Sequence, residues 1–193
     1  MYHYLEEGGI FMWPIFALLL LSSAIILEKL HILFIKQKSI NIAFKNTVKA
    51  KIKAKKFQEL NEYLKNYNNS IAVVLKQIIN EDDEITIEQC YQNEIKRLEH
   101  LSYFLGISIT IAPQLGLLGT VTGMIQSFKA LSNADESVVA SGISQALLTT
   151  AFGLCVAIFA LFFHIIFNKK IDYLNNEIYL YLNNLIKAKN EKN

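Results

Sequence analysis

Three long apolar stretches divide the chain, at about residues 10–27, 103–128 and 143–167. The second stretch, from Tyr103 to Phe128, holds 26 residues without Asp, Glu, Lys, Arg or His. A helix of that length crosses the roughly 30 Å hydrocarbon core of a bilayer. The pattern therefore predicts an all-α membrane protein with three transmembrane helices.

Small residues recur inside the second stretch and predict contacts with other helices. Gly119 and Gly123 form a G-x-x-x-G pair, and Ala112, Gly116 and Thr120 form a second row at a spacing of four. Small side chains let helix backbones approach closely within a membrane. Two such rows predict that this helix packs on two sides.

Pro113 lies within the second stretch and has two interpretations, which are compatible with each other. A proline removes the hydrogen bond to the carbonyl four residues earlier, here Ile109, and so predicts a kink. The carbonyl of Ile109, left without its helical partner, could also face water in a polar lining.

The polar segment 36–100 contains neither Pro nor Gly and shows no strand-like alternation, so it predicts helices. Short helices are expected near 40–54, 56–66 and 69–80. Thr86 followed by Gln89 fits a capping box. It predicts the start of one helix that runs without interruption to Phe128, about 64 Å at about 1.5 Å per residue.

The third stretch is expected to continue as an amphipathic helix after the membrane. Apolar residues beyond Asn168 recur at intervals of three and four, which is the spacing of one helix face. These residues are Ile171, Leu174, Ile178, Leu182, Leu185 and Ile186.

The basic residues are distributed unevenly, although the net charge is only +2. None precedes Lys29, twelve lie from Lys36 to Arg97, and only Lys129 lies between 98 and 168. The positive-inside rule places the lysine-rich side in the cytoplasm. This predicts an outer N-terminus and an inner C-terminus.

Several functional classes are not expected. The lysine-rich run 45–56 is followed by acidic residues, so nucleic-acid binding is not expected. The chain has no phosphate-binding glycine loop, no H-E-x-x-H motif and no Cys/His cluster. We therefore expect no catalytic activity, no metal ion and no cofactor.

The run from Ala112 to Met124, A-P-Q-L-G-L-L-G-T-V-T-G-M, resembles the signature of the ExbB/TolQ/MotA proton-channel family, most closely its ExbB and TolQ branch. Glu28 followed by Lys29 is a further similar feature at the inner end of the first span, where the family usually has Arg at the second position. The resemblance implies a bacterial inner-membrane location, so the outer side is the periplasm.

The expected organisation has seven parts. They are a periplasmic N-terminus (1–9), the first transmembrane helix with its exit (10–35), a cytoplasmic helical domain (36–100), the second transmembrane helix (101–128), a periplasmic loop (129–142), the third transmembrane helix (143–167) and a cytoplasmic C-terminal helix (168–193).

The spans also carry polar side chains that avoid lipid by facing protein or water. They allow two interpretations, hydrogen bonding between helices or a polar lining. The resemblance implies a lining, because Thr120 and Thr150 occupy threonine positions of the family. The candidate proton-pathway residues are Thr120, Gln145, Thr149 and Thr150. Gln145 departs from the family, which has Glu at this position.

Neither the second nor the third span contains Asp or Glu, and His164 lies at the inner end. A moving proton would therefore need an acid from a partner. The resemblance names an ExbD- or TolR-like single-span protein with a transmembrane Asp. It also implies a homopentameric ring that serves TonB- or TolA-dependent outer-membrane processes. A non-conducting membrane scaffold and a self-sufficient ion channel are the alternatives.

Overall fold

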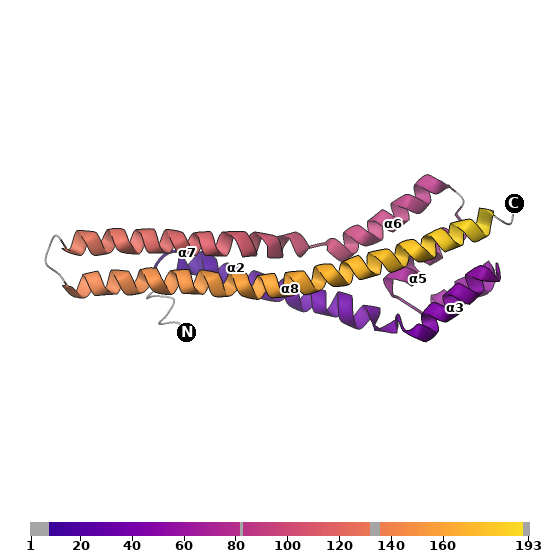
Figure 1. Cartoon of the computed structure of the whole chain (residues 1–193), viewed down its shortest axis with the longest axis horizontal. Helices are drawn as coiled ribbons and strands as arrows, with labels where there is room; N and C mark the ends of the chain where they lie inside the picture. Colours follow the sequence, from indigo (N-terminus) through magenta and orange to yellow (C-terminus); the bar gives the residue numbers. More distant parts are fainter. Residues whose placement is uncertain (1–7, 82, 132–135, 191–193) are drawn as a thin grey trace. The chain divides into compact units, whose positions relative to one another are not determined.

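The computed structural model describes residues 8–81, 83–131 and 136–190, and these residues form helices without a strand (Figure 1). Three helical segments are long and apolar enough to cross a membrane. The predicted fold class, an all-α membrane protein with three transmembrane helices, is confirmed. The elements in order are α2 (Met12–Leu30), a π-helical turn η1 (His31–Ile35), a 3₁₀ turn η2 (Lys36–Ser39), α3 (Ile42–Lys53), α4 (Phe57–Lys65), α5 (Ser70–Ile78), α6 (Glu84–Glu99), α7 (Ser102–Leu131) and α8 (Glu136–Asn190).

The chain forms two compact units. The first comprises Met1–Leu27 and Leu101–Ile165, and the second comprises Glu28–His100 and Ile166–Asn193. Both α2 and α8 therefore contribute residues to each unit.

In the first unit, α7 runs beside the first half of α8 (Figure 1). The buried residues of α7 in this unit recur every three or four positions, so they share one face. They are Ser102, Leu105, Ser108, Ala112, Gly116, Gly119, Gly123, Ser127 and Ala130. The prediction that α7 packs against other helices on two sides stays a prediction, because it also concerns helices of other chains. Gly116, Gly119 and Gly123 form one stripe, because spacings of three and four return to the same helix face.

Both helices extend into the segment expected as a loop over 129–142. The helix α7 continues to Leu131 and α8 begins at Glu136, while residues 132–135 lie outside the described residues. The Ser127 hydroxyl donates a hydrogen bond of 3.0 Å to the carbonyl of Val139, near the start of α8. This pairing keeps the ends of the two helices together.

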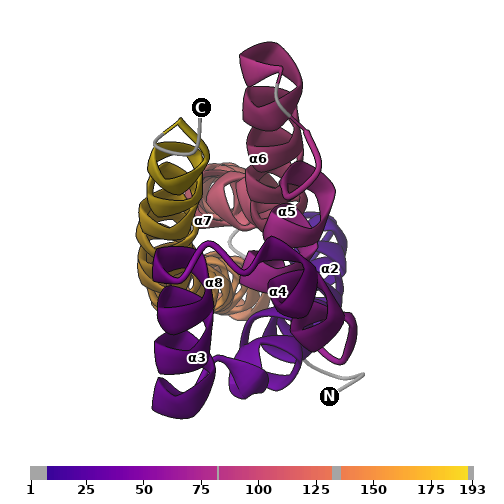
Figure 2. The same ribbon diagram turned by 90° about the vertical axis from the view of Figure 1, so that its right-hand side faces the viewer.

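The second unit contains the short helices expected between residues 40 and 80, which Figure 2 shows in the foreground. Asparagine side chains cap two of them, since Asn41 accepts from the Phe44 amide and Asn69 accepts from the Ala72 amide. The Phe44 ring packs against Tyr67 with centroids 4.8 Å apart. Local caps and apolar packing together fix the ends of these helices.

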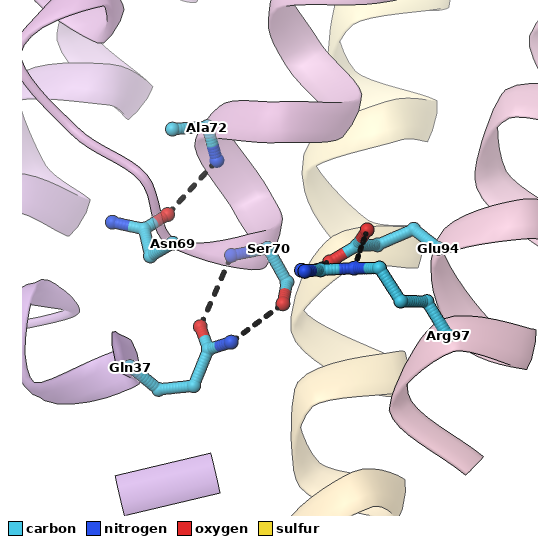
Figure 3. A network of polar contacts seen from close by, with 6 residues as sticks. All are labelled: Gln37, Asn69, Ser70, Ala72, Glu94 and Arg97. Carbon is cyan, nitrogen blue, oxygen red and sulfur yellow. Dashed lines mark hydrogen bonds and ion pairs between the residues drawn. The ribbon is translucent and has the colours of Figure 1, made fainter. Parts of the chain in front are cut away.

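A buried amide joins η2 to the start of α5 (Figure 3). The Gln37 side chain donates to the Ser70 hydroxyl at 2.7 Å and accepts from the Ser70 amide at 3.0 Å. Asn69 also donates to the Ser39 hydroxyl at 3.0 Å. These bonds satisfy the polar groups of a fully buried helix start.

The expected uninterrupted helix from Thr86 to Phe128 is wrong. Two helices, α6 and α7, cover this segment instead. The helix α6 starts at Glu84, because Asp83 rather than Thr86 supplies the cap and accepts a hydrogen bond from the Thr86 amide at 3.0 Å. It then ends at Glu99, and Leu101 adopts a positive φ of 65° before α7 begins.

Lys29 gives the physical reason for this break. Its ammonium donates a hydrogen bond of 2.5 Å to the carbonyl of Leu98, and its side chain is only 2% exposed. In an unbroken helix that carbonyl would accept from the amide of Ser102. A cation at a helix C-terminus satisfies the carbonyl and interacts favourably with the helix dipole.

The expected continuation of the third span as a helix is confirmed. The helix α8 runs for 55 residues to Asn190, and Ile171, Leu174 and Ile178 are buried on its inner face. Lys45 of α3 binds Glu177 at 2.7 Å. Burial lowers the pKa of Lys45, but its hydrogen bonds to Glu177 and Tyr173 outweigh this effect and leave the pKa raised.

Candidate functional site

The glycines of α7 bring α8 close enough for its threonines to contact the α7 backbone. A Cβ atom added to Gly116 would lie 3.0 Å from the Cα of Thr150. A Cβ atom added to Gly119 would lie 2.5 Å from the Cγ2 of Thr149. The expectation that these glycines are helix-contact positions therefore agrees with the geometry of the described chain.

Thr149 and Thr150 both bind backbone carbonyls at this contact. The Thr150 hydroxyl donates to the carbonyl of Gly116, across the two helices, at 2.9 Å. Thr149 is fully buried, and its hydroxyl lies 2.7 Å from the Gln145 carbonyl and 2.9 Å from the Gly8 carbonyl. One hydroxyl proton serves these two acceptors.

Gln145 lies against the backbone that precedes α2. Gly9 has a φ of +71°, and a Cβ atom on it would lie 1.7 Å from the Gln145 Nε2 atom. Only glycine combines that conformation with so close an approach. Gln145, Thr149 and Thr150 are thus brought together with residues 8–9 and Gly116.

Thr120 does not join this hydrogen-bonded group in the described chain. Its hydroxyl donates to the carbonyl of Leu117, in its own helix, at 2.6 Å. Thr122 likewise binds only carbonyls of α7, those of Leu118 and Gly119. Of the four candidate pathway residues, three form one cluster and Thr120 lies apart from it.

Gly153 allows a close approach between α8 and α7 that the sequence analysis did not predict. A Cβ atom on Gly153 would lie 2.5 Å from the carbonyl oxygen of Ala112, directly before Pro113. The helix α7 continues through Pro113, which is partly buried. A signal for this contact exists in the third span, where small residues recur at three and four. They are Gly142, Ala146, Thr149, Gly153 and Ala157.

The expected pair of inner-interface charges lies in two different environments. Glu28 is exposed, whereas Lys29 is buried against the last turn of α6. Sequence reasoning found both residues but not this helix-capping contact of Lys29.

Comparison with known proteins identifies a family match. The sequence pattern of the MotA/TolQ/ExbB proton channel family matches residues 43–179. An ExbB-like biopolymer transport protein of Synechocystis sp. is 32% identical over 166 residues, which cover 80% of this chain and 65% of that protein. The TolQ protein of the Tol-Pal system of Haemophilus influenzae is 44% identical over 68 residues, 34% of this chain and 30% of that protein.

The biopolymer transport protein ExbB of Salmonella typhimurium is 44% identical over 64 residues, which cover 32% of this chain and 26% of that protein. The chain spans less than two thirds of the length of each of these relatives.

Proposed function

This chain belongs to the MotA/TolQ/ExbB proton channel family, and on that premise we propose that it is a motor subunit of the ExbB/TolQ type. It resides in the bacterial inner membrane and uses the proton-motive force. A proton that crosses 100 mV releases about 2.3 kcal/mol, which can bias a rearrangement of partner helices.

The observation that carries the proposal is the cluster of Gln145, Thr149 and Thr150 between spans that contain no Asp or Glu. Hydroxyl and amide groups can relay a proton by exchanging hydrogen bonds, but none of them holds a stable charge. The acid that binds and releases the proton is therefore supplied by a partner. An ExbD- or TolR-like single-span protein with a transmembrane Asp fits this requirement.

In the proposed assembly the subunits form a pentameric ring around the partner helices. Gly116, Gly119 and Gly123 hold α7 and α8 together within each subunit, and the partly exposed Thr120 contributes to the lining beside the partner helices. The ring energises TonB- or TolA-dependent outer-membrane processes such as nutrient import.

The scaffold alternative is favoured by one specific observation. The hydroxyls of Thr120, Thr149 and Thr150 all bind backbone carbonyls of the same chain, which by itself explains their presence in a membrane. A self-sufficient channel is less well supported, since the second and third spans contain no carboxylate.

The proton-channel proposal predicts that flux depends on the partner. Proteoliposomes that hold this chain alone and a pH-sensitive dye should be nearly proton-tight, because an unpaired charge is costly to bury. Adding the Asp-bearing partner should create flux. Thr150→Val should then reduce the flux about tenfold, equivalent to roughly 1.4 kcal/mol in the barrier.

Thr110→Val is the matched control, because the Thr110 hydroxyl is exposed and binds only carbonyls of its own helix. Its flux should equal that of the unchanged protein. Rapid flux through the lone chain would support the self-sufficient channel. Flux absent with the partner, or insensitive to Thr150→Val, would support the scaffold.

The lysine distribution predicts that the start of α8 is periplasmic and that α4 is cytoplasmic. The test uses a background with Cys90→Ser and Cys155→Ser. A membrane-impermeant thiol reagent added to spheroplasts, whose inner membrane is intact, should label Glu136→Cys. It should label Lys65→Cys only after the membrane is opened. The reverse pattern would invert the proposed topology.

A further inference from the structure

A shallow groove of about 400 Å³ lies within the second unit, between η1 and the part of α8 beside the predicted end of the third span. Its volume falls in the range of roughly 300–1,000 Å³ that is typical of small-molecule sites. The lining residues are Phe34, Ile166, Lys169, Lys170 and Tyr173. Both walls of the groove therefore come from segments that follow or end a predicted span.

The apolar wall of the groove combines η1 with α8. The turn η1 buries Leu33 but leaves Phe34 and Ile35 exposed. Ile166 of α8 is partly buried and lines the same groove. Exposed apolar side chains that lie together mark surfaces for a partner or a membrane. Beside the end of a span, an acyl chain is the apolar group that is at hand to cover them.

Two lysines of α8 form the polar side of the groove. The Lys170 ammonium lies 5.9 Å from the centroid of the Phe34 ring and 5.1 Å from the centroid of the Tyr173 ring, and these two contacts position it. Neither Lys169 nor Lys170 forms an ion pair with another described residue. No Asp or Glu is among the described residues that line the groove. Its polar side is therefore complementary to an anion.

Tyr173 adds a directed hydrogen-bond donor. Its hydroxyl oxygen accepts a hydrogen bond of 2.6 Å from the Lys45 ammonium, which also pairs with Glu177. A tyrosine hydroxyl has one proton of its own to donate. Among the described residues this proton has no acceptor. It can therefore be donated to an oxygen atom of a ligand in the groove.

We propose that this groove binds an anionic phospholipid at the membrane surface. Lys169 and Lys170 neutralise the phosphate group, and the Tyr173 hydroxyl donates a hydrogen bond to one of its oxygens. An acyl chain packs against Phe34 and Ile166. Basic pockets beside transmembrane helices recognise acidic headgroups in this way. The site rests on the predicted end of the third span but does not depend on the proposed proton pathway.

The first test measures the lipid that the full chain retains. Native mass spectrometry of protein released from nanodiscs of mixed phosphatidylcholine and phosphatidylglycerol should show preferential retention of phosphatidylglycerol. Lys169→Gln/Lys170→Gln should weaken this retention about tenfold, because each lysine near the surface attracts the acidic headgroup. The matched control is Lys65→Gln/Lys187→Gln, which removes the same charge from exposed lysines outside the groove and should retain the lipid normally.

The second test locates the lipid by fluorescence quenching. Trp13 is the only tryptophan of the chain, so the variant Trp13→Phe/Phe34→Trp carries its single indole in the groove. Phosphatidylglycerol with brominated acyl chains should quench this fluorescence more strongly than brominated phosphatidylcholine at the same concentration. Adding Lys169→Gln/Lys170→Gln should abolish the difference. Equal quenching by the two lipids before the lysines are changed would overturn the proposal.

Tyr173→Phe tests the hydroxyl without removing the aromatic ring. Retention of phosphatidylglycerol should fall about threefold, the effect of one hydrogen bond. The melting temperature should change little, because Lys45 keeps its ion pair with Glu177. Unchanged retention would contradict the hydrogen bond that we assign to the hydroxyl.

A final arm tests a free phosphate compound as the occupant. Inorganic phosphate, compared with sodium chloride at equal ionic strength, should not displace phosphatidylglycerol from the protein beyond the effect of salt. Specific displacement by phosphate would assign the groove to a soluble anion and overturn the proposal. Equal retention of the two lipids, or equal losses in the groove and control variants, would overturn it as well.

Discussion

Gly153→Ala should separate α7 from α8 and lower the melting temperature of the protein markedly. The new Cβ atom would lie 2.5 Å from the carbonyl oxygen of Ala112 and 3.2 Å from its carbonyl carbon. Both are backbone atoms, so no side chain can rotate away to make room. Overpacking of this kind costs about 1–3 kcal/mol. Loss of the adjacent Thr150 bond to Gly116 would add about 1 kcal/mol.

Gly106→Ala is the matched control for this prediction. Gly106 lies in the same helix as Ala112, but a Cβ atom there would have no neighbour within 4 Å. Melting of both variants in detergent can be followed by circular dichroism at helical wavelengths. The packing argument would be wrong if Gly153→Ala melted at the same temperature as Gly106→Ala.

Gln37→Leu should destabilise the second unit, although leucine has nearly the same volume. The Gln37 side chain is 4% exposed and makes two hydrogen bonds to Ser70, one of them to the backbone amide (Figure 3). Leucine would leave that amide and the Ser70 hydroxyl buried without this partner. Each unsatisfied group costs about 1–3 kcal/mol.

Hydrogen exchange with mass spectrometry gives the most direct measurement of this loss. The amides at the start of α5, from Ser70 onward, should exchange faster in Gln37→Leu. Gln92→Leu provides the control, because Gln92 is exposed and binds only Glu88 in its own helix. Unchanged protection at Ser70 in Gln37→Leu would show that the amide pair contributes little.

The spans and most helices could be predicted from the sequence because their signals are local. Uncharged length identifies a membrane helix, and the recurrence of Ile171, Leu174 and Ile178 identifies the buried face of α8. Asn69 caps α5 through its immediate neighbours. Each of these features depends on residues close together in the chain.

The break between α6 and α7 could not be predicted in this way. Neither His100 nor Leu101 is a glycine or proline, so the local sequence favours a continuous helix. The break depends instead on Lys29, which binds the Leu98 carbonyl from 69 residues away. A long-range contact of this kind has no periodic signature.

The candidate site was predictable in its residue types but not in its arrangement. Thr149 and Thr150 contact α7 as interhelical polar residues should, and Gly116 and Gly119 make room for them. The sequence does not show that the carbonyl of Gly8 meets Thr149, because a backbone acceptor can come from any residue. The separation of Thr120 from the cluster likewise depends on which helix face packs.

The length of α8 links the folding of the two units. The helix is continuous through Ile165 and Ile166, where one unit ends and the other begins. If either unit unfolded alone, α8 would gain a frayed end at this boundary, and up to four backbone groups would lose their helical partners. Because helix propagation is cooperative, this penalty opposes a half-folded chain, and stability gained in one unit is shared with the other.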